Sequence, residues 1–345
     1  MLTVNPGSTS TECAYFNQNT LLWKKSIDHS NDELSYHVID QLPTRLKYIA
    51  SQLSVNQIDA IAARGGPLKP LSGGVFEISQ AMLLEYRQAT YANHASNLGA
   101  LIAHELAEKW SVPAYIVDPV TLDDFTDKAR ISGVPGIERK SRCHALNIKY
   151  CYFKTCNEND IPADSGRFIV GHFGSGFSIA SVVGGKIIDV NDALLGMGPF
   201  SIDRAGALPL AGILSLIYEK KLTKPDLEKL LSTESGLKAY LGTNNFRDIE
   251  TRYNRGENIV EQIVDGMIYQ ISKEIGSCFA VLNGNCDGLI ITGGLANSSL
   301  FIESLTSAVA FIKNIYVYPG SYESEALASG VLRVLLGKEQ AKVYQ

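Results

Sequence analysis

Two short turns rich in glycine and serine, about half a chain length apart, constrain this fold more than any other feature. Residues 5–11 read Asn-Pro-Gly-Ser-Thr-Ser-Thr, and residues 171–178 read Gly-His-Phe-Gly-Ser-Gly-Phe-Ser. Each turn lies between two apolar strands, and glycine there allows positive φ and close backbone approach, so that N–H groups and hydroxyls can face an anion. One such turn would be an ordinary hairpin. Two copies predict a duplicated domain that holds phosphates from two sides.

Size and composition exclude several classes of function. The chain has 345 residues, 45% of them hydrophobic and 19% charged, which suits two packed domains. The net charge is −5 and the longest basic cluster, residues 139–142, is short, so we expect no nucleic-acid partner. Six cysteines form neither a CxxC pair nor a zinc-ligand spacing, and no signal peptide is evident, which predicts reduced thiols and a cytoplasmic location.

One stretch is long enough to raise the question of a membrane. Residues 168–185 carry no formal charge apart from a possible proton on His172. Five glycines, several β-branched residues and an embedded turn favour buried strands instead. We therefore expect no membrane partner.

The pattern along the chain predicts three strands followed by alternating strands and helices in both halves. In the first half, Ser30-Asn-Asp-Glu33 predicts a capping box before a helix, and Asn93 is a candidate cap for another. The predicted strands there are 2–4, 13–16, 58–63 and 114–117, with a helix at 95–110. In the second half the predicted strands are 168–170, 179–183, 186–190, 289–292 and 315–318, and the helices are 210–220, 225–231, 258–282, 297–312 and one after 323.

The polar segment 157–166 predicts the domain boundary. We expect domains at 1–160 and 161–325, with the final helix, 323–345, packing back on the first. Glycine-rich turns at strand ends, facing one another across two α/β domains, predict a ligand site in the cleft between them.

Neither common phosphate-binding motif is present, because the chain contains no P-loop and no Gly-x-Gly-x-x-Gly after a strand. Its other motifs are Ala63-Arg-Gly-Gly66, His94-Ala-Ser-Asn97, His144-Ala-Leu-Asn147, Gly198-Pro-Phe-Ser-Ile-Asp-Arg-Ala-Gly206 and Ile291-Thr-Gly-Gly-Leu-Ala-Asn297. With the two turns, these resemble the short-chain acyl kinases, the acetokinase family, and most closely its butyrate branch. That family belongs to the acetate and sugar kinase, heat-shock chaperone and actin superfamily.

The resemblance implies two duplicated actin-like (ribonuclease H-like) α/β domains with a central nucleotide cleft, and a homodimer or higher homo-oligomer. The implied reaction is reversible transfer of the γ-phosphoryl group of ATP to butyrate, giving butyryl phosphate and ADP, with Mg²⁺. Its partners are therefore a small carboxylic acid and its acyl phosphate. A carboxylate is already a nucleophile at neutral pH, so such an enzyme needs cations and backbone donors more than a base.

The resemblance also assigns roles by position. Asn5 and Glu323 match magnesium-associated residues, although Glu323 also suits a helix N-terminus. The phosphate and nucleotide residues it implies are Ser8, Ser10 and Thr11 in the first turn, Gly174, Ser175 and Gly176 in the second, and Gly293 and Gly294.

Five residues are implied in catalysis, and four of them have an alternative. His172 matches a histidine near the transferred phosphoryl group, or is a satisfied core residue. Arg204 matches an arginine for carboxylate or phosphate, or forms a surface pair with Asp203. Asp118 matches an orienting carboxylate, or only starts a turn with its proline. His94 either reaches phosphate or caps a helix. Arg64 takes the place of a second carboxylate-binding arginine.

Three departures from the family bear on the substrate. Glu12 stands where acyl kinases generally carry lysine after the first turn, which would be costly near ATP unless the carboxylate points away or binds metal. Ile61 replaces an arginine of the acetate enzymes, and residues 140–142 replace their Phe-His-Gly segment. These differences favour a butyrate-type pocket.

Other readings stay open at this point. The acceptor could instead be acetate, propionate or a branched acid. A sugar kinase would use Asp118 as its base, and a non-catalytic nucleotide-binding module would explain Glu12 as lost catalysis.

Overall fold

The computed structural model describes residues 1–29, 35–53 and 57–345. The chain divides into two compact units, one of Met1–Asp123 with Tyr322–Gln345 and one of Asp124–Ser321. Each unit is built around one β-sheet with its own apolar core. The capping box predicted at 30–33 lies outside the described residues.

The first unit contains a seven-stranded mixed sheet in the order β12-β5-β6-β4-β1-β2-β3. The meander β1-β2-β3 is antiparallel, β4 is the parallel neighbour of β1, and β6 is the parallel neighbour of β4. The strands are β1 (Leu2–Pro6), β2 (Ser10–Asn17), β3 (Thr20–Asp28), β4 (Ile61–Arg64), β5 (Val75–Glu77), β6 (Ala114–Val117) and β12 (Lys342–Val343). The helices are η1 (Val38–Gln41), α1 (Leu42–Gln52), α2 (Gln80–Gln88), α3 (Asn97–Trp110) and α12 (Glu323–Leu335).

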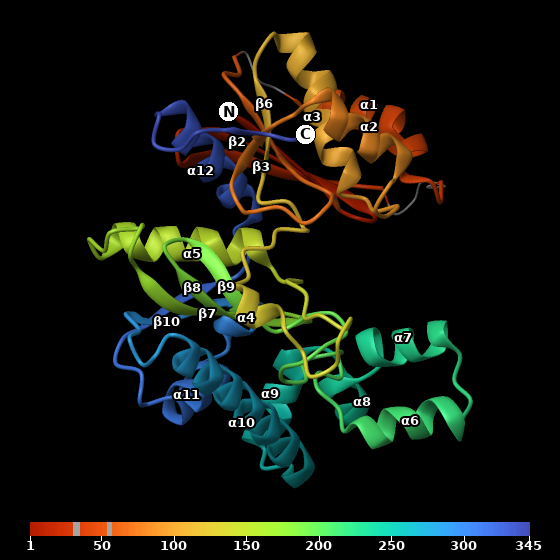
Figure 1. Ribbon diagram of the computed structural model, residues 1–345, viewed down its shortest axis with the longest axis vertical. Helices are drawn as coiled ribbons and strands as arrows, with labels where there is room; N and C mark the ends of the chain where they lie inside the picture. Colours follow the sequence, from red (N-terminus) through yellow and green to blue (C-terminus); the bar gives the residue numbers. More distant parts are fainter. Residues whose placement is uncertain (30–34, 54–56) are drawn as a thin grey trace. The chain divides into compact units, whose positions relative to one another are not determined.

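The second unit contains a five-stranded sheet in the order β11-β10-β7-β8-β9. Helix α5 contacts β7 and β10, while α10 contacts β7, β8 and β9 and packs on α11 (Figure 1). The strands are β7 (Arg167–Phe173), β8 (Phe177–Val183), β9 (Lys186–Val190), β10 (Gly288–Gly293) and β11 (Ile315–Pro319). The helices are α4 (Asp127–Arg130), α5 (Ala145–Glu158), α6 (Leu210–Tyr218), α7 (Lys224–Thr233), α8 (Gly236–Leu241), α9 (Phe246–Asn254), α10 (Asn258–Val281), η2 (Gly294–Asn297) and α11 (Ser299–Ala308).

The two sheets share one plan. The order β3-β2-β1-β4-β6 in the first unit corresponds to β9-β8-β7-β10-β11 in the second, with the same parallel and antiparallel pairings. A three-stranded meander followed by parallel strands therefore occurs twice. This confirms the duplicated α/β fold predicted from the paired turns.

The division between the compact units falls between Asp123 and Asp124, ahead of the boundary we predicted after residue 160. Helix α5 explains the difference, because Cys151, Tyr152 and Cys156 are buried and the helix lies on β7 and β10 of the second sheet. Helix α12 contacts β1, β4 and β6, and so belongs to the first unit.

Two local predictions were wrong. Helix α3 begins after Ser96 rather than Asn93, whose side chain instead accepts from Val38 N–H and donates to the Tyr36 carbonyl. The apolar spacing of the helix predicted at 258–282 also places Ile259 on its buried face. In α10, Ile259 is instead 52% exposed, and the buried face includes Val260.

Three further properties concern membrane-spanning helices, the cysteines and the exposed helices α6 and α7. No helix among the described residues is long and apolar enough to cross a membrane. All six cysteines carry free thiols. Helices α6 and α7 have no buried residue, and α6 exposes Leu210, Leu214 and Tyr218.

Candidate active site

The first turn consists of Gly7, Ser8 and Thr9, between the end of β1 and the start of β2. Gly7 N–H donates to the Ser10 carbonyl at 2.8 Å, which closes the turn. Arg45 of α1, a fully buried side chain, donates to the carbonyls of Gly7, Ser8 and Ser10 at 2.9–3.0 Å. The carbonyls of the turn thus face the guanidinium.

The hydroxyls near this turn differ in direction. Ser8 is exposed and Ser10 is half-buried. Thr11 is fully buried, and its Oγ1 accepts from Arg45 Nη1 at 3.0 Å and bonds His29 Nε2 at 3.1 Å. Its side chain therefore lies inside the unit, although we predicted that it faces phosphate.

A charged cluster joins the two predicted magnesium residues. Asn5 Nδ2 donates to Glu323 Oε2 at 2.7 Å, and Arg64 Nη1 contacts the same carboxylate oxygen at 3.0 Å. Arg64 Nη1 also lies 3.4 Å from Asn5 Oδ1. Asn5 ends β1, Arg64 ends β4, and Glu323 is in the first turn of α12, so three elements meet here. Arg64 Nε is buried and has no hydrogen-bond acceptor within the described parts of the chain.

The donor set of this cluster suits magnesium better than a transition metal. Mg²⁺ is held by one or two carboxylates while substrate phosphates and water complete its octahedron, and Glu323 with the Asn5 amide oxygen offers such a partial set. Within the described residues no group of three or more His, Cys, Asp and Glu side chains is arranged to hold a metal by itself.

Glu12 has two partners in the first unit. Its Oε1 lies 3.0 Å from Lys24 Nζ and accepts from the Ser324 hydroxyl at 2.6 Å. Strand β2 places Glu12 directly opposite Asn5, on the same face of the sheet. The carboxylate is therefore paired by a cation and a helix-terminal hydroxyl.

Asp118 and His94 also lie in the first unit. Asp118 is 4% exposed, and its Oδ1 accepts from Gly74 N–H at 2.8 Å while its own N–H donates to the Gly74 carbonyl. Its φ of 41° is in the left-handed region. His94 Nδ1 bonds Ser96 Oγ at 2.6 Å. Partial burial and the nearby Arg64 charge lower the pKa of His94.

The second turn consists of Gly174, Ser175 and Gly176, again three residues between strands. Glycine would allow positive φ in both turns, but Gly7, Gly174 and Gly176 do not adopt it. In the second turn, close packing restricts the side chain instead. A Cβ on Gly176 would stand 2.2 Å from Arg204 Nη1, and one on Gly174 would stand 3.3 Å from His172 Nε2.

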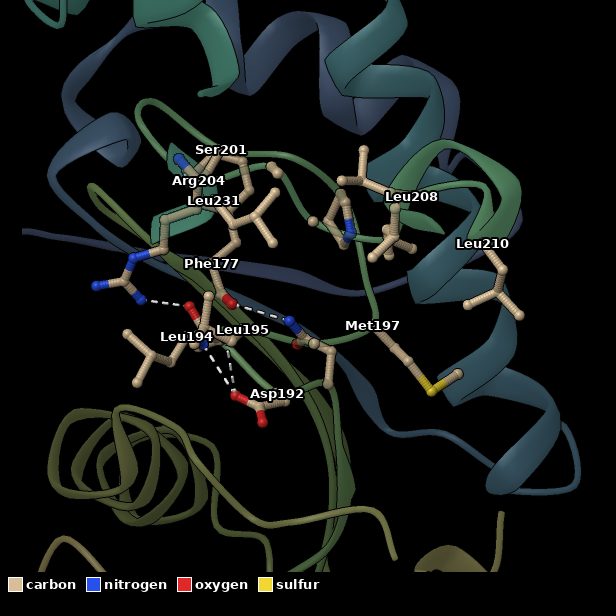
Figure 2. A pocket seen from close by; sticks show the side chains of 18 residues that line it. Phe177, Asp192, Leu194, Leu195, Met197, Ser201, Arg204, Leu208, Leu210 and Leu231 are labelled. Atoms are coloured by element: carbon tan, nitrogen blue, oxygen red, sulfur yellow. Dashed lines mark hydrogen bonds between the residues drawn. The ribbon is translucent and has the colours of Figure 1, made fainter. Parts of the chain in front are cut away.

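Arg204 therefore lies directly against the second turn. It donates to the Ala193 carbonyl (Figure 2) rather than pairing with Asp203, whose buried Oδ1 has no hydrogen-bond partner in the part of the chain that is described. Burial lowers the pKa of Arg204, and the carboxylates of Asp203 and Asp192 oppose this change. A guanidinium stays charged at neutral pH even so.

A cavity of about 230 Å³ opens beside Arg204 within the second unit (Figure 2). Its wall is mainly apolar, and the Arg204 and Asp192 side chains supply its charges. The apolar lining includes Phe177, Leu194, Leu195, Met197, Leu208, Ile213 and Leu231. The cavity combines an apolar interior with one guanidinium and one carboxylate, and the guanidinium with the apolar lining suits a small amphiphilic anion.

His172 lies within β7 rather than after it, and is 7% exposed. Its Nδ1 bonds Asn147 Nδ2 at 2.8 Å, and its ring stacks on His144 with centroids 4.0 Å apart. Its Nε2 is the atom nearest to the position of a Cβ on Gly174. The histidine is thus aimed at the second turn.

Gly293 and Gly294 follow β10. Gly293 has φ of 95°, and a Cβ there would stand 2.3 Å from the Phe173 carbonyl oxygen, so no other residue fits. A Cβ on Gly294 would meet nothing within 4 Å. Gly293 is therefore required by packing, and Gly294 borders open space.

Chemically, the first unit offers the charged cluster around Glu323 and an exposed turn. The second unit offers a guanidinium, an imidazole and an apolar cavity beside its turn. The sequence did not single out Arg45 or Thr292. A buried arginine on an amphipathic helix gives no motif, and threonine in a strand looks like any β-branched residue.

Comparisons with known proteins identify the family of the chain. The model of the acetokinase family matches residues 135–320. A probable butyrate kinase 2 of Caldanaerobacter subterraneus subsp. tengcongensis is 41% identical over 100% of this chain and 99% of its own. Butyrate kinase 2 of Clostridium acetobutylicum is 40% identical with the same coverage.

Solved structures show the same fold. The acetate kinase of Porphyromonas gingivalis superposes with a TM-score of 0.80 at 19% identity, covering 97% of this chain and 99% of that one. A propionate kinase of Francisella tularensis gives 0.77 at 19% identity, covering 95% and 98%. The predicted actin-like α/β fold is thereby confirmed.

Proposed function

The chain belongs to the acetokinase family, and we propose that it catalyses reversible transfer of the γ-phosphoryl group of ATP to butyrate, giving butyryl phosphate and ADP. The two relatives that share 41% and 40% of their residues with the whole chain are named as butyrate kinases. Ile61, which replaces an arginine of acetate enzymes, supports the same acceptor.

One observation carries this proposal: the Arg204 guanidinium lies both against the second turn and at the edge of the apolar cavity. A short-chain fatty acid has one carboxylate and an apolar tail. The planar donors of arginine suit carboxylate and phosphoryl oxygens alike, while the leucine-lined interior suits the tail. The hydroxyl groups of a sugar would find few hydrogen-bond partners on this lining.

In the proposed reaction, a carboxylate oxygen attacks the γ-phosphorus, and the bond from that phosphorus to the β,γ-bridging oxygen breaks, which releases ADP. The attacking carboxylate is already ionised at neutral pH, so no base is required. Charge spreads over the transferred phosphoryl oxygens. We assign Arg204 and the ring of His172 to this charge, since both adjoin the second turn.

The remaining assignments follow the polar groups of each unit. Ser8, Ser10 and the second turn (residues 174–176) are assigned to the nucleotide phosphates. Gly294 is assigned to the adenosine side. Thr11 contributes only through its backbone, because its hydroxyl is bonded inside the unit. Arg64 and His94 are assigned to the anionic reactants, and Asp118 to holding the Gly74 loop beside them.

Asn5 and Glu323 would hold magnesium. When bound, the ion would neutralise charge on the β- and γ-phosphates. Chelation with EDTA should therefore abolish acyl phosphate formation, and excess Mg²⁺ should restore it.

We also propose a cytoplasmic homodimer. The six free thiols suit a reducing compartment. The exposed apolar side chains of α6 suit a second copy of the chain.

Incubation with ATP, Mg²⁺ and a panel of acids of two to five carbons, with hydroxylamine trapping, tests the proposed function. We expect hydroxamate with butyrate as the preferred acid. If none of the acids gives hydroxamate, the proposal is overturned. Phosphorylation of hexoses instead of carboxylic acids would identify a sugar kinase.

A further inference from the structure

Three buried side chains form a row across neighbouring strands of the second unit. In the sheet register, Ser178 of β8 and Thr292 of β10 both stand directly opposite His172 of β7. Directly opposite residues point to the same face of a sheet. Ser178 and Thr292 are 0% exposed and His172 is 7% exposed.

The start of α5 bonds every member of this row. His144, the N-cap residue, bonds Ser178 Oγ through Nδ1 at 2.8 Å. Asn147, in the first turn of α5, contacts His172 Nδ1 at 2.8 Å and Thr292 Oγ1 at 3.0 Å, both through Nδ2. Asn147 is 1% exposed. Two bonds from one amide nitrogen therefore link β7 to β10.

The direction of these bonds follows from the hydroxyl of Thr292. That hydroxyl donates its single proton to the Gly320 carbonyl at 3.2 Å, so toward Asn147 it acts as an acceptor. The Asn147 atom facing it must then be the amide nitrogen. Since the same nitrogen faces His172, the Nδ1 of that histidine accepts a hydrogen bond.

A neutral imidazole that accepts at Nδ1 carries its proton on Nε2. Nε2 is the atom that faces Gly174 of the second turn. We propose that Asn147 is a positioning residue that fixes His172 as the Nε2–H tautomer, so that the histidine presents a hydrogen-bond donor to the phosphoryl group held at this turn. The inference rests on the proposed function for the identity of that group.

The tautomer can be measured without activity. The full-length protein is labelled with ¹⁵N-histidine, and the two ring nitrogens of His172 are assigned by comparison with His172→Gln. We expect a protonated Nε2 in the wild type. In Asn147→Asp the new carboxylate only accepts hydrogen bonds, so the proton should appear on Nδ1.

Kinetics test the consequence. Asn147→Asp should lower kcat for butyrate by about 10²-fold, the scale of a lost oriented donor, while the KM for butyrate stays within about twofold. Thr292→Val removes the acceptor that orients the amide and should lower kcat in the same direction by a smaller factor. Asn159→Asp makes the same chemical change at the other end of α5, where the side chain bonds the Thr155 carbonyl, and should leave kcat unchanged.

The outcomes separate the two claims. A wild-type His172 protonated on Nδ1 overturns the inference, as does a tautomer switch in Asn147→Asp that leaves kcat intact. If Asn147→Asp does not fold, the wild-type tautomer and Thr292→Val decide the matter. A protonated Nε2 in a wild-type protein that forms no acyl phosphate supports the fixed tautomer and overturns the proposed function.

Discussion

Each unit places a polar side chain two residues ahead of its glycine-rich turn. The row of side chains around it includes carboxylates and an arginine in the first unit but not in the second. Each turn has three residues, and the residue two positions before it lies in the first meander strand: Asn5 in one unit and His172 in the other. In the first unit Asn5 lies opposite Glu12 and beside Arg64, and the first turn of α12 bonds this row through Glu323 and Ser324.

In the second unit the row contains no carboxylate, lysine or arginine side chain. Ser178 and Thr292 flank His172, and α5 bonds the row through His144 and Asn147. One fold therefore supports a row with carboxylates and an arginine that suits a cation and phosphates, and a row of hydroxyls, an amide and imidazoles that suits an oriented imidazole. The backbone plan repeats, and the chemistry follows from the side chains placed on it.

The two turns also differ in how an arginine meets them. Arg45 holds the first turn from inside through its carbonyls, whereas Arg204 lies against the second turn at the edge of a cavity. This contrast predicts that the first arginine acts on stability and the second on activity.

Arg45→Met should have the largest effect. Several turn carbonyls and the Thr11 hydroxyl would lose a donor, and unsatisfied buried acceptors cost about 1–3 kcal/mol each, so we expect a loss of about 4 kcal/mol in the free energy of unfolding. Urea unfolding measures it. The control is Arg87→Met, which removes a half-exposed pair with Glu105 and should cost under about 1 kcal/mol. Equal losses in both variants would break the contrast.

Arg204→Ala should lower kcat/KM for butyrate by about 200-fold or more, which corresponds to about 3 kcal/mol or more of transition-state stabilisation, because a charge clamp is lost. The midpoint of unfolding should barely change. Arg247→Ala removes an exposed guanidinium of the same unit and should leave kcat/KM intact. Near-normal turnover by Arg204→Ala would remove the role assigned to it.

Gly176→Ala should lower kcat/KM by about 10²-fold, because the new Cβ would stand 2.2 Å from Arg204 Nη1 and must displace the guanidinium. Gly174→Ala should cost less, since its closest neighbour, His172 Nε2, is 3.3 Å away. Gly133→Ala, where a Cβ meets nothing within 4 Å, is the control. A larger loss in Gly174→Ala than in Gly176→Ala would show that the histidine, and not Arg204, is the more sensitive partner of this turn.

The smallest effect concerns pH in the first unit. Because the pKa of His94 is lowered in the folded protein, the unfolded chain binds a proton at this residue at a higher pH than the folded protein does. Its contribution to stability is thus present above the ordinary histidine pKa and is lost as pH falls through the folded pKa. His94→Gln should therefore reduce the difference in unfolding free energy between pH 7.5 and pH 5.5 relative to the wild type, as measured by urea unfolding. An unchanged difference would contradict the account of this residue.

Much of the fold follows from the sequence because its patterns are local. The repeated hairpin, the apolar strands and the strand-to-helix alternation predict the five strands of the second sheet and β1, β2, β4 and β6 of the first, and the polar residue after Val117 marks a strand end. Strands β3, β5 and β12 of the first sheet were not predicted. The position of α5 does not follow, because only tertiary packing assigns it to the second sheet. The inward direction of the Thr11 side chain and the row of side chains around His172 both depend on partners distant in sequence. No local pattern contains these partners.

The reverse reaction tests the central claim most directly. Purified protein is incubated with butyryl phosphate, ADP and Mg²⁺, and the ATP formed is measured. The account predicts ATP in amounts equal to the butyryl phosphate consumed, with neither product nor consumption when ADP is omitted. Consumption of butyryl phosphate without ATP, or no consumption at all, would contradict it.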